Sequence, residues 1–426
     1  MSLGLGLAVI LLFAALGMPL FAVIAAIAML GFHLAGYDLI AVTVEFYRLG
    51  DMPGLIAIPL FTLAGYLLGE SGAPRRLVRL SNALLGWLPG GLAIVAIVAS
   101  SFFTAFTGAS GVTIVALGAL LYPALRQAGY SQHYSLGLVT AAGSLGLLFA
   151  PSLPLILYGF VAGQMGSDPP VTIPDLFLAG LLPGLLMVAM LSLHAMWVGR
   201  GIPQSRHRFD TVELARALRE TAWELPLPVI VLGGIYTGAM AASEAAAVTA
   251  LYVLLVNVLI KKEITFRKLP AVMAESMRLV GAILLILGAA LALSNWLIDQ
   301  EVPATLFAAL NEHVQSPWVF LLLLNLFLLA VGMLLDIFSA VVILTPLLLP
   351  VAAAFGIHPV HLGVVMLANL QLGYFTPPVG MNLFIAAYRF GQPVLVLVRA
   401  CIPFFLVLAA AVALITWWPA LSLGLL

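Results

Sequence analysis

Long apolar runs separated by short polar loops dominate the chain. A helix needs about 20 apolar residues to cross about 30 Å of hydrocarbon. Six runs have roughly the length of one span or somewhat more, at residues 54–70, 131–160, 176–199, 270–297, 360–388 and 393–418. Two longer runs, 1–35 and 226–260, each predict two short helices, broken at Gly17-Met18-Pro19 and near Gly238 to Ser243. The pattern predicts an all-α integral membrane protein with about ten transmembrane helices.

Charged residues are too few for a water-soluble protein. Hydrophobic residues make up 63% and charged residues 8% of the chain, whereas soluble domains have about 45–50% and about 25%. The partner that this composition demands is the lipid bilayer. Lys plus Arg equals Asp plus Glu at 17 each, so no net charge points to nucleic acid, and we expect no such partner.

The basic residues predict an orientation in the membrane. They gather at Arg75 to Arg79, at Arg126, at Arg200 to Arg219 and at Lys261 to Lys268. By the positive-inside rule these loops face the cytoplasm. The loops around Asp168 and over 299–316 have no Lys or Arg and face the other side, and both termini then lie outside with them.

Two apolar stretches must start and end on the same side of the membrane. Residues 91–123 lie between two cytoplasmic loops, and residues 317–350 lie between two external ones. We therefore predict two re-entrant hairpins. Non-helical backbone at membrane depth is tolerated only where protein or a watery cavity surrounds it, so the tips indicate binding sites.

A weak internal repeat relates the two halves. Gly146 to Pro154 follows the first hairpin, and the Pro-containing stretch from Gly373 to Gly380 follows the second, about 227 residues later. The predicted topology gives these halves opposite orientations. Inverted repeats with a site near the bilayer midplane are typical of secondary transporters.

In the first half, hydroxyls and small residues lie at the predicted tip. Thr107 and Ser110 flank Gly108-Ala109, and the facing break at 142–146 contains Ser144 and Gly146. Backbone carbonyls and hydroxyls offer the oxygen ligands that a hard cation such as sodium requires. Close helix packing also favours Gly, Ala and Ser in membranes, and at the tip this alternative stays open.

In the second half, the candidate residues include a carboxylate. An ionisable residue within a membrane segment indicates a functional site by default. Asp336 is the clearest such residue in this chain. Its alternative role is a helix N-cap at the hairpin turn, and both roles can hold together. The candidates at the tip and the facing break are Gly332, Asp336, Ser339, Asn369, Gly373, Thr376 and Val379.

Arg48 is a candidate for receiving an anionic substrate, because its guanidinium fork suits a carboxylate. The alternative is an interfacial Arg that extends its charge to water. Enzyme motifs such as His-Glu-x-x-His and Gly-x-Ser-x-Gly are absent, as is a phosphate-binding loop for ATP. We therefore predict a protein that is not an enzyme and that does not hydrolyse ATP itself.

Taken together, short motifs along the chain resemble the large membrane subunit of tripartite ATP-independent periplasmic (TRAP) transporters, the DctM-like subunit. The motifs are Ala57-Ile-Pro-Leu-Phe-Thr-Leu-Ala-Gly65, Pro151-Ser-Leu-Pro-Leu-Ile-Leu-Tyr-Gly159, Leu232-Gly-Gly-Ile-Tyr236, Glu244-Ala-Ala-Ala247, Leu344-Thr-Pro-Leu-Leu-Leu-Pro350 and Thr376-Pro-Pro-Val-Gly380. The resemblance runs nearly end to end. At the first tip the chain has Thr107-Gly108-Ala109 where many members have Ser-Gly-Ser, which leaves open whether Thr107 or Ser110 is the ligand.

The resemblance implies a sodium-coupled importer of a small organic anion in the bacterial inner membrane, with both termini in the periplasm. It implies an elevator mechanism and two partners, which are a small four-helix membrane (Q) subunit and a periplasmic substrate-binding (P) protein. Two or more sodium sites are implied where each tip meets its facing break, at the candidates above. Substrate contacts are expected from Arg48, Thr107, Ser110 and Ser339.

The same resemblance implies a division of the chain. Residues 1–70 and 226–298 form scaffold helices of the two repeats. Residues 71–160 form an arm helix, the first hairpin and its broken helix, and 299–390 form the second hairpin and broken helix. Residues 161–225 connect the repeats, and 391–426 form the C-terminal helix. A stand-alone sodium/anion carrier without a binding protein is the alternative, and the sequence does not determine which organic acid is carried.

Overall fold

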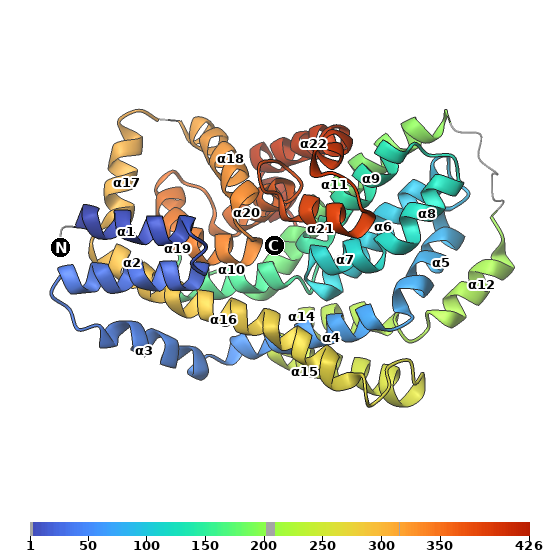
Figure 1. Cartoon of the computed structure of the whole chain (residues 1–426), viewed down its shortest axis with the longest axis horizontal. Coiled ribbons are helices and arrows are strands. Elements are labelled where there is room, and N and C mark those ends of the chain that lie inside the picture. The colour runs from blue at the N-terminus through green and yellow to red at the C-terminus, as the bar shows by residue number, and fades with distance from the viewer. Residues whose placement is uncertain (1–2, 202–208, 315) are drawn as a thin grey trace.

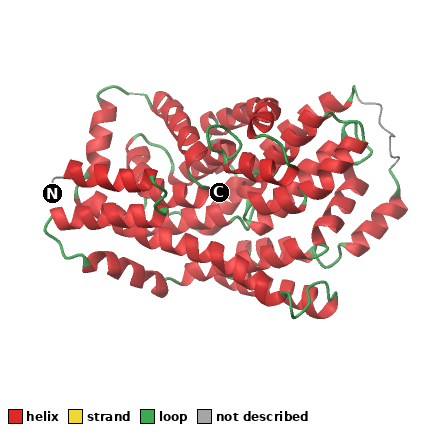
Figure 2. Cartoon of the chain, viewed as in Figure 1, coloured by secondary structure: helices red, strands yellow, loops and turns green. Residues whose placement is uncertain are grey.

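The computed structural model describes residues 3–201, 209–314 and 316–426 (Figure 1). All regular structure in this part of the chain is helical, and loops connect the helices (Figure 2). The first half contains α1 (Leu3–Ala15), α2 (Leu20–Leu34), α3 (Ile40–Arg48), α4 (Ala57–Glu70), α5 (Ala73–Leu85), α6 (Gly91–Thr107), α7 (Ser110–Ala116), α8 (Gly118–Gln127), α9 (Gln132–Ala142), α10 (Leu153–Gln164) and α11 (Ile173–Gly199). Short 3-10 helices lie at Leu49–Asp51, Pro53–Ile56 and Leu145–Leu148.

The second half is also built of helices. It contains α12 (Thr211–Glu220), α13 (Pro226–Pro228), α14 (Gly234–Tyr236), α15 (Ala242–Leu254), α16 (Leu269–Asp299), α17 (Val302–Asn311), α18 (Pro317–Leu334), α19 (Ile337–Ala354), α20 (Pro359–Gly373), α21 (Met381–Phe390), α22 (Val394–Trp417) and α23 (Ala420–Leu423). Turns of π-helix occur at Val229–Gly233 and Leu255–Ile260.

The breaks between helices lie where the sequence predicts them. The first long run is interrupted between α1 and α2, where Gly17 has a φ of +97°. The other is interrupted between α14 and α15, where Gly238 has a φ of +69°. Glycine carries no Cβ and adopts such left-handed conformations without steric cost. Both predicted hairpins consist of helices joined by a short break, at Gly108-Ala109 and at Leu335-Asp336.

Among the described residues, six helical segments are long and apolar enough to cross a membrane, and the bent pair Gln132–Leu148 and Leu153–Gln164 gives a seventh. The six are Ile173–Gly199, Ala242–Ile260, Leu269–Asp299, Pro317–Leu334, Ile337–Ala354 and Val394–Trp417. Shorter apolar helices, including α2, α4, α6 and α20, add to these. The chain is therefore an integral membrane protein, as its composition predicts.

The helices form two groups. Helix α4 contacts both α15 and α16, and α2 and α3 pack on α16; we call these five helices the outer layer, which runs along the lower part of Figure 1. The other group, which we call the inner body, comprises α6 to α11 and α18 to α22. It touches the outer layer mainly where α6 meets α4 and where α19 meets α16.

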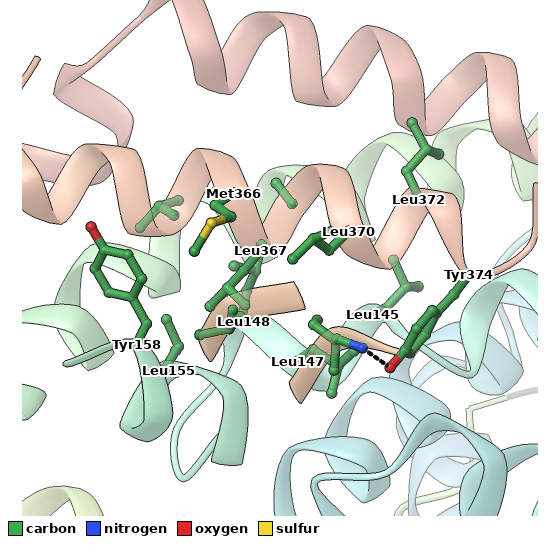
Figure 3. Packing of buried hydrophobic residues seen from close by; sticks show 14 of the residues in the cluster. Leu145, Leu147, Leu148, Leu155, Tyr158, Met366, Leu367, Leu370, Leu372 and Tyr374 are labelled. Atoms are coloured by element: carbon green, nitrogen blue, oxygen red, sulfur yellow. Dashed lines mark hydrogen bonds between the residues drawn. The ribbon is translucent and has the colours of Figure 1, made fainter. Parts of the chain in front are cut away.

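Helix α20 lies at the centre of the inner body, and every residue from Pro359 to Gly373 is buried. Its apolar side chains pack against the break after α9 and against α10 (Figure 3). The Tyr158 hydroxyl on α10 donates a hydrogen bond of 2.6 Å to the carbonyl oxygen of Pro359. The two halves of the sequence thus share one core.

Candidate functional site

Both hairpin tips line one cavity of about 300 Å³. The first tip contributes Gly108 to Val112, and the second contributes Asp336 to Phe338. The opposite wall belongs to the outer layer, with Tyr66 on α4 and Leu279 to Ile286 on α16. The cavity therefore lies between the inner body and the outer layer, where both halves of the chain meet.

A second cavity of about 310 Å³ adjoins the first and shares Tyr66, Gly111, Val112 and Ile385 with it. It is also lined by Glu70 at the end of α4 and by Glu275 near the start of α16. These helix ends adjoin the basic loops of the chain. The cavity that holds the tips is thus continuous with space on the side of the basic loops.

The Ser110 side chain joins the first tip to the second half of the chain. Its hydroxyl donates a hydrogen bond of 2.7 Å to Oδ1 of Asn382, at the start of α21. The Asn382 side chain is fully buried, and its backbone N–H donates to the carbonyl oxygen of Tyr374 at 2.9 Å. Asn382 is not among the residues predicted from the sequence. The signal available was a polar residue within an apolar membrane helix.

A cluster of oxygens lies behind the first tip. The Thr104 hydroxyl on α6 lies 2.6 Å from the Thr113 hydroxyl on α7 and 2.9 Å from the carbonyl oxygen of Gly143. All three residues are buried. Both threonines were also missed by our sequence analysis, although they lie at nearly equal distances in sequence on the two sides of the tip. The break at 142–146 thus approaches both arms of the first hairpin, and the groups that meet there are two hydroxyls and a carbonyl oxygen.

The other candidates in the first break lie nearby. The Ser144 hydroxyl donates to the carbonyl oxygens of Ala141 and Gln371, each at 3.3 Å. Gly146 packs on the last two turns of α6, and a Cβ there would come within 2.2 Å of the Ser101 carbonyl oxygen. Only glycine permits this approach of the break to α6.

Asp336 caps α19 and also lines the cavity. Its Oδ1 accepts a hydrogen bond of 3.0 Å from the backbone N–H of Ser339, and its Oδ2 accepts one from the Ser339 hydroxyl. The N-cap alternative is therefore confirmed, and the carboxylate still borders open space. Beside it, the backbone N–H of Ile337 donates to the Tyr374 hydroxyl at 2.6 Å (Figure 3). This bond joins the second tip to the second break.

Gly332 and Gly373 bring α18 and α20 into backbone contact. A Cβ on Gly373 would lie 2.5 Å from the carbonyl carbon of Gly332. The backbone N–H of Gly380 donates to the carbonyl oxygen of Met333 at 3.0 Å. The second break is thereby joined to the last turn of α18 before the tip.

The remaining candidate residues of the second break do not line the first cavity. The Thr376 hydroxyl donates to the carbonyl oxygen of Leu372 at 2.8 Å, and Val379 is 42% exposed. The Asn369 amide donates to Oδ1 of Asn325 at 2.5 Å, and the Thr416 hydroxyl donates to the same oxygen at 3.0 Å. Asn369 thus joins α18, α20 and α22, and it is not among the residues that line the cavity.

Three candidates for substrate contact lie outside the cavity lining. Arg48 forms an ion pair of 3.0 Å with Glu45 one turn earlier on α3, and its side chain is 53% exposed. Thr107 is fully buried, and its backbone packs against Gly65 of α4. The Ser339 side chain is buried against Asp336. Of the expected substrate contacts, only Ser110 lines the cavity.

The donor set at the two tips consists of oxygen atoms of the kind that could hold a hard cation. Hydroxyl, carbonyl and carboxylate oxygens are the ligands that hard cations select. Over the described residues, no group of three or more His, Cys, Asp or Glu side chains gathers in the way that a transition metal would need. The first tip offers neutral oxygens, and the second adds the Asp336 carboxylate.

Comparison with known proteins identifies relatives along the whole chain. Residues 6–421 match the family described as the tripartite ATP-independent periplasmic transporter, DctM component. The C4-dicarboxylate TRAP transporter large permease protein DctM of Pseudomonas aeruginosa is 33% identical over 387 residues, which cover 90% of this chain and 89% of that protein. The isethionate TRAP transporter permease protein DctMQ of Oleidesulfovibrio alaskensis is 34% identical over 382 residues, which cover 89% of this chain and 59% of that protein.

Among solved structures, the Alcanivorax borkumensis YdaH transporter is similar in fold. The TM-score is 0.61, with 17% sequence identity and coverage of 90% of this chain and 88% of that one. The relatives are named as transport proteins, which confirms the prediction of a transporter rather than an enzyme. The family match also confirms the resemblance seen in the sequence motifs. The chain belongs to the DctM component family of tripartite ATP-independent periplasmic transporters.

Proposed function

We propose that this chain is the translocating subunit of a sodium-driven importer of a small organic acid in the bacterial inner membrane. A periplasmic binding protein delivers the acid, and a small four-helix membrane subunit enlarges the outer layer. The observation that carries the proposal is the cavity between the inner body and the outer layer, which the tips of both hairpins line.

The architecture suits an elevator mechanism. Tips, breaks and α20 are joined by hydrogen bonds and by the Gly332–Gly373 contact, so the inner body can move as a unit. The outer layer supplies α4 and α16 as a fixed wall. In this reading the scaffold is residues 1–70 and 226–298. The cavity extends toward Glu70 and Glu275, so this arrangement is the one open to the cytoplasm.

Sodium ions at the tips would offset the negative charge of the substrate. The described residues that line the first cavity include one charged side chain, the Asp336 carboxylate. An organic anion therefore needs bound cations beside it in this space. Because inward movement of sodium follows its gradient, coupling the two ligands in one cavity would power uptake without ATP hydrolysis.

The names of relatives support a small organic acid as the substrate. The names of the two relatives above specify a C4-dicarboxylate and isethionate, which are both small organic anions. The relative named DctMQ is longer than the part that matches this chain, which is consistent with a second membrane component. We expect the binding protein to set most of the selectivity, since most residues that line the cavity are apolar and the polar ones are Tyr66, Ser110, Asp336 and Tyr374.

Uptake into proteoliposomes tests the proposal. The chain and its small partner are reconstituted and supplied with a panel of labelled carboxylates and sulfonates, with a sodium or a potassium gradient and with or without the cognate binding protein. We expect accumulation only when both sodium and the binding protein are present. Sodium-driven uptake without the binding protein would support the stand-alone carrier instead, and equal uptake in both gradients would refute sodium coupling.

A further inference from the structure

A cluster of charged side chains fixes the beginning of α5. Arg76 on the first turns of this helix contacts two carboxylates from distant loops, Glu224 after α12 and Glu263 between α15 and α16. Its guanidinium lies 2.6 Å from Glu224 and 2.5 Å from Glu263. Lys261 contacts the same Glu224 oxygen at 3.0 Å. We call these four side chains the α5 clamp.

Three of the four clamp side chains are largely buried, Glu263 is more exposed, and the contacts are geometrically specific. The exposed fractions of the side chains are 15% for Arg76, 15% for Lys261, 4% for Glu224 and 25% for Glu263. Nε and Nη2 of Arg76 both donate to Oε1 of Glu224. A carboxylate pair around one guanidinium uses the planar fork of Arg, which a Lys cannot reproduce.

Glu263 also holds the backbone of α5. The N–H of Gly72, which precedes the helix, donates to Oε2 of Glu263 at 2.7 Å. A carboxylate at this end of a helix satisfies a free N–H and complements the helix dipole. Burial opposes ionisation of Glu263, but the hydrogen bonds from Arg76 and Gly72 hold the pKa of Glu263 below its ordinary value of 4.5. Glu263 is therefore charged at neutral pH.

The position of α5 gives this clamp a mechanical consequence. Along its length α5 packs on α6, the first arm of the first hairpin, while the clamp joins its beginning to the stretch between α12 and α13 and to the loop between α15 and α16. Beneath the clamp, Ala73 belongs to a separate apolar cluster with residues of α4, α15 and α16. The helix thus spans from the outer layer to the inner body and is fixed at one end.

The counterpart of α5 in the second half is held differently. Helix α17 follows α16 as α5 follows α4, and it packs on α19 of the second hairpin. Its contacts include the edge-to-face rings of Phe307 and Phe355. Arg76 and Arg79 of α5 form ion pairs, whereas α17 contains no charged side chain. Helices α5 and α17, which connect the outer layer to the inner body, are therefore held by different kinds of interaction.

We propose that the α5 clamp is a fixed pivot that positions the first hairpin against the outer layer during transport, with Arg76 and Glu263 as positioning residues. The proposal rests on the movement of the inner body proposed above. Because α17 lacks such a clamp in the described part of the chain, its end of the molecule can slide on apolar contacts while the beginning of α5 stays in place.

The variants Glu263→Gln and Arg76→Lys test this proposal, with Arg79→Gln as the matched control. Glu263→Gln keeps the shape of the side chain and removes its charge, and Arg76→Lys keeps the charge and loses the fork. Arg79 lies on the same helix and pairs with Glu213 and Glu220, but it is 42% exposed. Exposed ion pairs of this kind contribute little.

Two measurements separate positioning from folding. The first is uptake kinetics, for which we expect the maximal rate of both clamp variants to fall about tenfold, with unchanged half-saturation by sodium and substrate. The second is cross-linking of Gly69→Cys with Val112→Cys in a Cys401→Ala background, since a Cβ on Gly69 would lie 3.4 Å from Val112. This pair joins α4 to the first hairpin and reports their relative position.

In the clamp variants we expect slower and less complete cross-linking than in the parent and in Arg79→Gln, with the same thermal unfolding temperature in detergent. Wild-type uptake and wild-type cross-linking in a folded Glu263→Gln protein would overturn the proposal, as would an equal effect of Arg79→Gln. Cross-linking needs no sodium or substrate, so it tests the clamp even if the proposed transport activity fails.

Discussion

Asp336 shows how one side chain serves both structure and a proposed ion site. Its carboxylate caps α19 through Ser339 and borders the cavity between the layers. Asn and Asp are about equally good N-caps, so the charge can be removed while the cap is kept. The two roles are thus separable by a single substitution.

We expect Asp336→Asn to leave the fold intact and to weaken sodium dependence. Losing a hydrogen-bonded charge costs roughly 1.5–3 kcal/mol, about 10- to 100-fold in the half-saturating sodium concentration. Uptake against sodium concentration measures the shift, and thermal unfolding checks the fold. Asp210→Asn is the control, because Asp210 caps α12 outside the cavity. An unchanged sodium response would remove Asp336 from the site.

At the scale of elements, glycine contacts decide how the broken helices meet the hairpins. Gly373 of α20 touches the backbone of Gly332 on α18, and Gly146 touches α6 at Ser101. In both halves a break approaches a hairpin arm without intervening side chains. From the sequence, these small residues could serve either helix packing or ligand binding. The contacts explain their presence, because close packing of the helices by itself requires small residues at these positions.

We expect Gly373→Ala to separate α18 from α20. A Cβ there would meet backbone atoms at 2.5 Å and 2.6 Å, and overpacking of this kind costs about 1–3 kcal/mol. A lower unfolding temperature in detergent and weaker sodium dependence should appear together. Gly4→Ala on α1 is the control, since nothing lies within 4 Å of that position. A Gly373→Ala protein with parental stability would contradict the close contact.

At the scale of the molecule, the two halves of the chain build one site. Ser110 bonds to Asn382, Ser144 to Gln371 and Tyr158 to Pro359, across 272, 227 and 201 residues of sequence. Neither half forms the cavity alone, because the tips of both hairpins line it. The second cavity extends this space toward the basic loops, which the charge pattern assigns to the cytoplasm.

This arrangement predicts sidedness of access. A cysteine at Val115, which lines the second cavity and is 46% exposed, should react with a membrane-impermeant thiol reagent in inside-out vesicles and not in right-side-out vesicles. A cysteine at Glu312, in the exposed stretch after α17 that the charge pattern places outside, should show the reverse. Labelling of Val115→Cys only from the outside would invert the predicted orientation.

The sequence alone determined the class of the protein, the places where helices break and the positions of both hairpin tips. These features are local: apolar length, glycine and proline act within a few residues. Only the tertiary structure decided which groups meet, such as Ser110 with Asn382, Thr104 with Gly143, and Arg76 with Glu224 and Glu263. It also placed Arg48, Thr107 and Asn369 outside the cavity lining. Partners separated by tens to hundreds of residues leave no periodic signal in one sequence, because packing of the whole chain brings them together.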